Sequence, residues 1–312
     1  MQQLDSHELT RLLPFPQLIE ALRAAFVAGA SVPLRHSHTI GEGDDAGTSL
    51  LMPAWDDTGH YGVKIVNIYP ANRKRGLPGL HSTYMLFNGE TGAPIAMLDG
   101  DVITSRRTAA AAALGASFLA RADASRLVVA GAGRVGSLVG PAMAAVRPLD
   151  QLAVWDIDAA AAERCAAAWR EAGLPARAVT DLEAAAREAD IVSCATLARQ
   201  PFVRAEWLKP GSHLDLIGSF TPAMTEAEPA CFGQADVWVD TDEALLKSGD
   251  LLNAMHDGVW ARASLRGDLM QLCCESVDGR TDDRQRTVFK AVGTALEDLA
   301  AAKLACHAAG AA

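Results

Sequence analysis

Apolar and polar positions follow two different patterns along the chain, and the change comes near residue 123. Before that point, apolar residues at helical spacing predict a helix over residues 16–30, and an alanine-rich segment predicts another over residues 104–119. Between them lie four short strand-like runs, at residues 48–52, 61–67, 81–87 and 94–98. Strands that follow one another without intervening helices predict an antiparallel sheet.

After residue 123, strands alternate with helices. The predicted strands occupy residues 126–130, 152–155, 178–180, 191–195, 214–217 and 237–239. The predicted helices occupy residues 135–146, 159–172 and 181–188, and residues 288–306 are predicted to form one long amphipathic helix. Because such alternation is typical of βαβ units, this part of the chain predicts an α/β fold with a doubly wound parallel sheet.

A glycine-rich turn follows the first strand of the second pattern. Gly131, Gly133 and Gly136 have the spacing of the dinucleotide-binding turn, with a strand before them and a helix after them. The first glycine permits the tight turn, the second admits the diphosphate and the third lets the helix pack against the strand. Arg134 and Val135, inside the turn, belong to the same expected cofactor site.

An acidic residue completes this motif. Asp156 lies 20 residues after Gly136, at the end of the next predicted strand, where a carboxylate accepts hydrogen bonds from the adenosine ribose. The same carboxylate repels a 2′-phosphate, so Asp156 favours NAD(H), with NADP(H) as the alternative. Asp158 could share this role.

The composition narrows the function classes. The chain has 312 residues, with 28 basic and 38 acidic side chains and a net charge of −10, which argues against non-specific binding of nucleic acid or anionic membrane. No charge-free apolar run reaches the length of a membrane span, and no signal segment begins the chain, so we expect a cytoplasmic protein. The six cysteines form no CxxC pair and indicate neither a metal site nor disulfides. Asp240, Asp242 and Glu243 are predicted to be a solvated cluster at a strand end.

Several further segments, taken together, carry a resemblance that covers nearly the whole chain. They are PLR at 33–35, LMPAW at 51–55, GVKIVN at 62–67, TGAPIAMLDG at 91–100, RTAA from Arg107, GAG at 131–133, AT at 195–196, GSFTPAMTE at 218–226 and TVFKAVGTALEDLAAA at 287–302. In order and spacing the chain resembles the ornithine cyclodeaminase/mu-crystallin family. The resemblance implies a homodimer in which a Rossmann domain, residues 119–291, is inserted in an α+β substrate-binding and dimerisation domain, residues 1–118 plus 292–312.

The resemblance also implies a site for a small α-amino or α-imino acid. Arg35, Lys64 and Arg107 stand at the positions of the family's carboxylate clamp, a task that suits a guanidinium with two parallel N–H donors and a lysine point charge. Lys64 is the one candidate for a catalytic proton donor.

Further cofactor and substrate contacts are implied in the same way. Arg107 and Thr108 also touch the cofactor diphosphate, and Thr196 flanks the nicotinamide ribose. Gly218 and Ser219 close the next strand over the same crevice. Val292 begins the helix that borders the substrate.

Two departures from the family pattern bear on the reaction. Cyclodeaminases that act on ornithine carry acids at two positions where this chain has Leu50 and Phe220, and an ornithine ammonium buried beside these apolar side chains would lack a partner. We therefore expect NAD(P)H-dependent reduction of a cyclic imino acid, Δ1-pyrroline-2-carboxylate or Δ1-piperideine-2-carboxylate, to the L-amino acid. The alternatives are an ornithine cyclodeaminase or alanine-dehydrogenase-like activity, and a mu-crystallin-like dinucleotide-dependent binding protein. A smaller departure is Val135, where many members have glutamine.

Overall fold

The computed structural model describes residues 1–311, apart from the side chains of Asp44 and Arg73. The chain forms two compact units. The first comprises residues 1–107 and 294–312, and the second comprises residues 108–293. The second unit is thus inserted in the first. Helix α3 (Gly100–Leu119) begins in the first unit and continues into the second.

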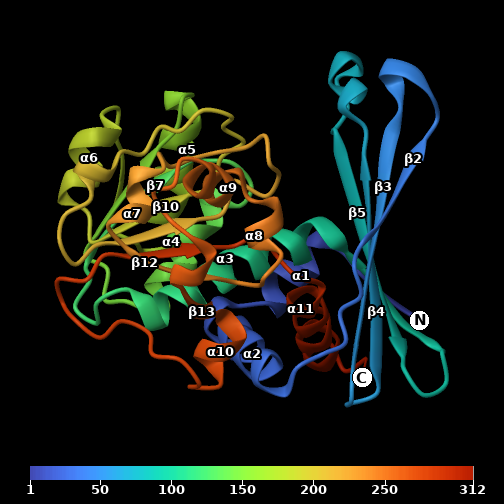
Figure 1. Ribbon diagram of the computed structural model, residues 1–312. Coiled ribbons are helices and arrows are strands. Elements are labelled where there is room, and N and C mark those ends of the chain that lie inside the picture. Colours follow the sequence, from blue (N-terminus) through green and yellow to red (C-terminus); the bar gives the residue numbers. More distant parts are fainter. Residues whose placement is uncertain (312) are drawn as a thin grey trace. The chain divides into compact units, whose positions relative to one another are not determined.

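The first unit contains a six-stranded sheet in the order β1-β6-β5-β4-β3-β2 (Figure 1). Its strands are β1 (Gln2–Leu4), β2 (His36–Ile40), β3 (Gly47–Asp56), β4 (His60–Ile68), β5 (Leu80–Asn88) and β6 (Pro94–Asp99). Strands β2 to β6 pair antiparallel, as consecutive strands without intervening helices predict, and β1 joins β6 in parallel. Short 3₁₀ turns at Gly43–Asp45 and Pro70–Arg75 lie in the connections.

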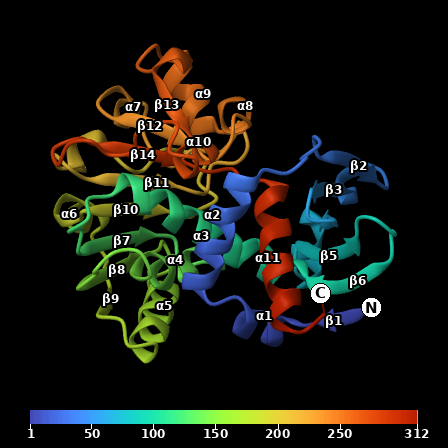
Figure 2. The ribbon, with the colours of Figure 1, turned by 90° about the horizontal axis from the view of Figure 1, so that it is seen from below.

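Helices cover one face of this sheet. Helices α1 (Ser6–Leu12) and α11 (Ala295–Ala308) pack on it, α11 against β3, β4 and β5, and α2 (Phe15–Ala28) packs against α11 (Figure 2). Cross-strand neighbours Met52, Lys64, Tyr84 and Leu98 form a row on the covered face, and all four are buried. The Tyr84 hydroxyl lies so close to Gly62 that a Cβ there would be 2.0 Å from it.

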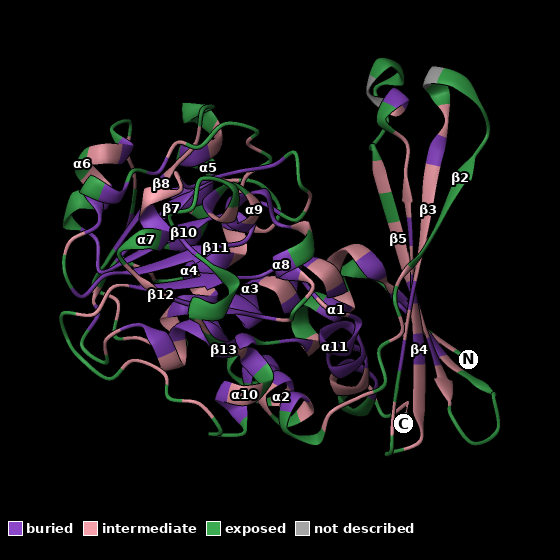
Figure 3. Ribbon diagram, in the orientation of Figure 1, coloured by how far each residue is buried: buried purple, intermediate pink, exposed green. Residues whose placement is uncertain are grey.

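Among the described residues, no helix of the first unit packs on the opposite face of the same sheet, which carries a group of apolar side chains. Trp55, Tyr61 and Phe87 form an aromatic cluster on it, with Tyr61 and Phe87 stacked at 5.4 Å between ring centroids. Val63 and Met85 continue this face and are half-buried, while Trp55 is 43% exposed. Figure 3 shows the contrast between these strands and the buried helix α11.

The second unit is built on an eight-stranded, fully parallel sheet in the order β13-β12-β14-β11-β10-β7-β8-β9. Its strands are β7 (Arg126–Ala130), β8 (Gln151–Trp155), β9 (Ala176–Ala178), β10 (Ile191–Cys194), β11 (His213–Leu216), β12 (Asp236–Val239), β13 (Leu265–Asp268) and β14 (Thr287–Lys290). The order runs outward from β7 in both directions, so the sheet is doubly wound as predicted and has its switch point between β7 and β10.

The helices of this unit connect the parallel strands. They are α4 (Gly136–Ala144), α5 (Ala159–Glu171), α6 (Leu182–Glu188), α7 (Ala230–Gly233), α8 (Ala244–Lys247), α9 (Gly249–His256) and α10 (Leu269–Cys273). Short 3₁₀ turns occur at Ala205–Trp207 and Arg262–Ser264. Among the described residues, no helix is both long and apolar enough to cross a membrane.

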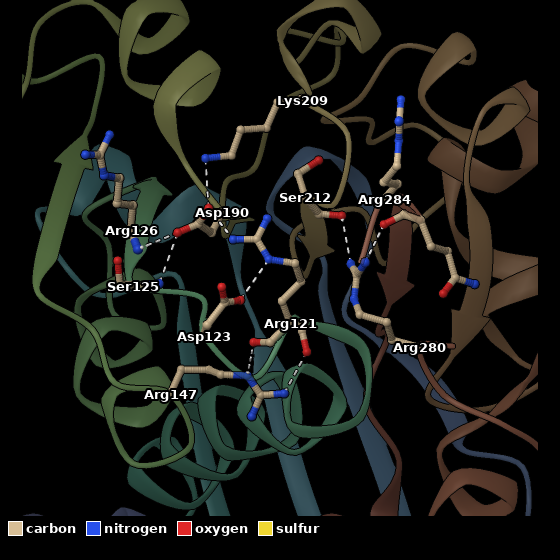
Figure 4. A network of polar contacts seen from close by, with 12 residues as sticks. Arg121, Asp123, Ser125, Arg126, Arg147, Asp190, Lys209, Ser212, Arg280 and Arg284 are labelled. Atoms are coloured by element: carbon tan, nitrogen blue, oxygen red, sulfur yellow. Dashed lines mark hydrogen bonds and ion pairs between the residues drawn. The ribbon is translucent and has the colours of Figure 1, made fainter. Parts of the chain in front are cut away.

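A polar network holds the amino ends of the central strands (Figure 4). The Asp190 carboxylate accepts hydrogen bonds from the backbone N–H groups of Ser125 and Arg126, each at 3.0 Å, and an ion pair from Lys209 at 2.8 Å. The Arg147 guanidinium donates to the carbonyls of Ala116 and Ser117 in the last turn of α3 and to that of Ala120 just after it. These contacts satisfy backbone groups that the ends of strands and helices leave open.

Three predictions are wrong: the single helix over residues 288–306, its amphipathic character, and the position of one strand. Residues 288–306 do not form one helix, because β14 ends at Lys290 and α11 begins only at Ala295. Gly293, with φ 80°, breaks the chain direction between them. The first turns of α11 are buried rather than amphipathic. The strand predicted at residues 178–180 lies at Ala176–Ala178 instead.

Candidate functional site

Two cations and two carboxylates form a buried cluster in the first unit. Lys64 lies in the middle of β4 and is 2% exposed, so it does not lie on an exposed strand face. Its Nζ is 2.7 Å from Oδ2 of Asp298. Arg107 on α3 contacts the other carboxylate oxygen of Asp298 through Nε at 2.8 Å, and Oε2 of Glu297 through Nη1 at 2.6 Å. The formal charges of these four residues sum to zero.

This cluster perturbs its own protonation. Burial lowers the pKa of Lys64 to about 8, and the charge of Arg107 acts in the same direction while Asp298 opposes both. Burial alone would raise the pKa of Asp298, but Lys64 and Arg107 outweigh it and hold that pKa below its ordinary value. Burial lowers the pKa of Arg107, and the two acids more than compensate, so Arg107 remains cationic. Of the two cations of the cluster, Lys64 is therefore the one whose pKa is lowered toward neutral.

Helix α11 supplies both acids of the cluster. Glu297 and Asp298 lie in its first turn, where carboxylates interact favourably with the N–H groups at a helix N-terminus, and both are fully buried. The sequence analysis did not identify these residues. The signal was present as two adjacent acids within an apolar, alanine-rich run, a pattern that requires either solvent or buried cations.

Leu50 lies on the same sheet as Lys64, and Arg35 lies just before a strand of that sheet. Arg35 is half-buried and directly precedes β2, whose first residue pairs with β3. Leu50 in β3 pairs with Val66, two residues beyond Lys64 on β4, so strand alternation puts Leu50 on the face that carries Lys64. The first unit thus brings two predicted clamp residues into one cluster, with Leu50 on the adjoining strand β3 and Arg35 just before the edge strand β2.

The glycine-rich turn has the geometry that a diphosphate requires. Gly131 has φ 105°, and a Cβ there would lie 2.7 Å from the carbonyl oxygen of Ala195. A Cβ at Gly136 would lie 1.9 Å from the carbonyl oxygen of Gly131. Gly133 differs, because nothing lies within 4 Å of its Cβ position. The turn is therefore crowded on the protein side and open at Gly133, so these residues fit a bound dinucleotide.

The acids after β8 have separate tasks. Asp156 is half-buried and accepts from the backbone N–H of Ala132 at 2.7 Å, which ties it to the glycine-rich turn. Asp158 caps α5 by accepting from the N–H of Ala160. Arg134 is exposed, and Val135 directly precedes α4. Asp156 is thus placed beside the turn, while Asp158 serves the helix.

Thr196 and Gly218 follow the carboxyl ends of β10 and β11 and share one buried partner. Glu226 accepts from the N–H of Thr196 at 2.7 Å and from its hydroxyl at 2.8 Å, and its second oxygen accepts from the N–H of Gly218 at 2.7 Å. The Ser219 hydroxyl is buried and donates to the carbonyl of Met224. Its oxygen accepts from the N–H of Asp250 at 3.1 Å. The Ser219 side chain is therefore bonded within the protein.

The remaining predicted residues lie in loops or on α3. Phe220 is 45% exposed in the loop after β11, and Thr108 is half-buried on α3. Val292 does not begin a helix; it lies in the connection between β14 and α11, where its N–H donates to Asp240 at 2.7 Å. Asp240 also accepts from the N–H of Gly293 and is 1% exposed, so its assignment to a solvated cluster is wrong. Sequence alone does not show that these backbone groups meet its carboxylate.

Comparison with known proteins agrees with this arrangement. A family model for the ornithine cyclodeaminase/mu-crystallin family matches residues 2–310. The chain belongs to this family. The resemblance drawn from the motifs is thereby confirmed.

Family members of known activity are similar over nearly the whole chain. A Δ1-pyrroline-2-carboxylate reductase of Paracoccus denitrificans is 34% identical, with 96% of this chain and 94% of the relative covered. The structure of the Thermococcus litoralis Δ1-pyrroline-2-carboxylate reductase in complex with NADH and L-proline superimposes with a TM-score of 0.92 at 32% identity, covering 99% and 97% of the two chains. An archaeal alanine dehydrogenase dimer with bound NAD gives a TM-score of 0.90 at 28% identity, covering 99% and 96%.

The cluster predicts a large stability effect. In Asp298→Asn the charges of Lys64 and Arg107 would outnumber the remaining acid, and breaking a buried ion pair from one side costs about 3–5 kcal/mol. We expect the free energy of unfolding in denaturant to fall by about 3 kcal/mol. As a control, Glu20→Gln removes the exposed pair with Arg23 in the same unit and should change stability by less than about 1 kcal/mol. Equal, small effects of both substitutions would contradict the account.

Proposed function

We propose that the protein is an NAD(P)H-dependent reductase of cyclic imino acids. Its substrate would be Δ1-pyrroline-2-carboxylate or Δ1-piperideine-2-carboxylate, and its product the corresponding L-amino acid. The observation that carries the proposal is the combination of a buried Lys64–Arg107 pair with apolar Leu50 and Phe220 at both positions where ornithine cyclodeaminases carry acids. The family resemblance assigns all four side chains to the substrate, and together they suit a ligand with one carboxylate and an apolar ring.

The cationic side chains would bind the substrate carboxylate. A guanidinium has five N–H donors and an ammonium has three, and Asp298 and Glu297 accept through three contacts. The acids fix Lys64 and Arg107 in position, so little ordering is left to the moment of binding. Arg35, which precedes β2 on the same sheet, would complete the clamp.

Lys64 would also control the proton. A protonated C=N bond is a better hydride acceptor, and a lysine whose pKa is about 8 holds a proton it can release near neutral pH. Asp298, 2.7 Å away, keeps the ammonium oriented. The bound reduced nicotinamide supplies the hydride to C2 of the substrate.

The residues around the glycine-rich turn would hold the cofactor. Gly131, Gly133 and Gly136 would receive the diphosphate, and Thr196 would flank the nicotinamide ribose. The family resemblance also assigns Arg107 and Thr108 of α3 to the diphosphate. Asp156 would accept from the adenosine ribose and so favour NADH over NADPH. A higher kcat/KM with NADPH than with NADH would contradict that preference.

The proposed reductase activity predicts the outcome of a paired assay. Purified protein with NADH and Δ1-pyrroline-2-carboxylate should lose the absorbance of reduced nicotinamide, whereas NAD+ with L-ornithine or L-alanine should give little turnover. The related alanine dehydrogenase makes L-alanine a necessary arm of the assay. Proline and ammonia formed from L-ornithine would contradict the proposal. Dinucleotide binding without turnover of any of these compounds would instead indicate a binding protein.

The role of Lys64 predicts a pH dependence. Its ammonium is present below about pH 8 and is lost above it, so kcat/KM for the imino acid should fall as the pH rises through about 8. In Lys64→Arg the residual activity should not fall in this pH range, because a guanidinium stays protonated across it. A fall in kcat/KM at the same pH in both proteins would assign the titrating group to the substrate and would exclude Lys64 from the proton step.

We further propose that the first unit forms a homodimer through the apolar face of its sheet. Large exposed apolar faces on a single protein commonly mark an interaction surface, and a related alanine dehydrogenase is a dimer. Phe87→Asp should convert the dimer to a monomer in light scattering after size exclusion. The control Leu246→Asp, at an apolar residue on α8 that is 66% exposed, should leave the dimer intact. A monomeric unmodified protein would contradict this proposal.

A further inference from the structure

Glu226 joins two loops at the carboxyl edge of the parallel sheet. Its side chain is fully buried, and its two carboxylate oxygens accept from backbone N–H groups on different loops. Oε1 accepts from Thr196 after β10, and Oε2 accepts from Gly218 after β11, both at 2.7 Å. The Thr196 hydroxyl adds a third donor at 2.8 Å.

The loops joined by Glu226 leave no spare room. A Cβ at Gly218 would lie 2.1 Å from the carbonyl oxygen of Thr196 and 2.3 Å from Oε1 of Glu226. The glycine-rich turn after β7 is part of the same packing, because a Cβ at Gly131 would lie 3.1 Å from the Thr196 side chain. A displacement of Thr196 would therefore disturb Gly218 directly, whereas the turn, which Thr196 approaches with its methyl group, would be affected less.

A second carboxylate fixes Glu226 itself. Asp250, in the first turn of α9, accepts from the backbone N–H groups of Glu226 and Ala227 at 2.7 and 3.1 Å and from the Thr225 hydroxyl at 2.9 Å. Both acids are fully buried, and Lys290, also fully buried, is the cation nearest to them, 3.8 Å from Asp250. Burial of these two carboxylates beside one lysine costs free energy, so the contacts that hold the two loops are made at a cost to stability.

We propose that Glu226 is a positioning residue for the nicotinamide end of the dinucleotide. It holds Thr196 and Gly218 in register at the carboxyl edge of the sheet, next to the switch point, where open α/β sheets bind their ligands. The inference rests on the proposed cofactor site. It assigns the adenosine and diphosphate end to the glycine-rich turn and Asp156, and the geometry of the nicotinamide end to Glu226.

Glu226→Gln tests this assignment. Each oxygen of Glu226 accepts from a backbone N–H, so an amide in its place presents its NH₂ group to one of these donors. Binding of NADH and of ADP, measured by calorimetry on the purified chain, separates the two ends of the cofactor, because ADP lacks the nicotinamide and its ribose. We expect the Kd for NADH to rise about tenfold or more and the Kd for ADP to stay within about twofold.

Asp190→Asn is a matched control. Asp190 also accepts two backbone N–H groups at strand ends, but at the amino ends of β7 and β10 (Figure 4). It should lower the melting temperature without changing the ratio of the two Kd values. If Glu226→Gln behaves like Asp190→Asn, or weakens NADH and ADP equally, Glu226 serves the fold alone and the proposal fails.

Glu226→Asp provides a second test if Glu226→Gln does not fold. It keeps the carboxylate but is one methylene shorter, so it cannot reach the N–H groups of both Thr196 and Gly218. It should raise the Kd for NADH without raising that for ADP, and an unchanged ratio would overturn the proposal. Both tests are independent of turnover. A protein that binds NADH but reduces no imino acid refutes the proposed reaction and leaves this inference standing, whereas NADH binding no tighter than ADP binding refutes the inference.

Discussion

The first unit depends on one electrostatic constraint, the mutual neutralisation of Lys64, Arg107, Glu297 and Asp298. A lysine in the middle of a buried strand and an arginine in a buried helix are costly unless anions meet them. Here the anions come from the last helix of the chain, 190 residues or more from the cations. The cluster therefore links the packing of the last helix to the arrangement of the candidate substrate clamp. A side chain that meets a substrate carboxylate in this way is already ordered before the substrate arrives.

The second unit uses carboxylates in a different way. Asp190 joins the amino ends of the central strands, and Glu226 joins the loops at their carboxyl ends. Glycine at positions 131 and 218 allows these loops to approach until no Cβ would fit. The contact at the amino ends of the strands thus serves stability, and the contact at their carboxyl ends lies where ligands bind in this fold.

The sequence predicts those features that depend on local pattern. Strand β7, the glycine-rich turn and Asp156 follow from periodicity and spacing, and the family motifs identify Lys64 and Arg107. Contacts between distant segments are not visible in this way. Glu297 and Asp298 have the appearance of solvated helix residues, and Asp240 that of a solvated strand end, until the elements that bury them are known. Residues 287–290 are too few for periodicity to distinguish a strand from the start of a helix. The positive φ of Gly293, which lies between this strand and α11, is a property of the fold.

The proposed reaction is tested most directly by following the hydride itself. The protein would be incubated with Δ1-pyrroline-2-carboxylate and NADH that carries deuterium at C4 on the transferred face, and the product examined by mass spectrometry and NMR. The account predicts L-proline with one deuterium at C2. Product without deuterium at C2, or no product from this substrate, would contradict the account.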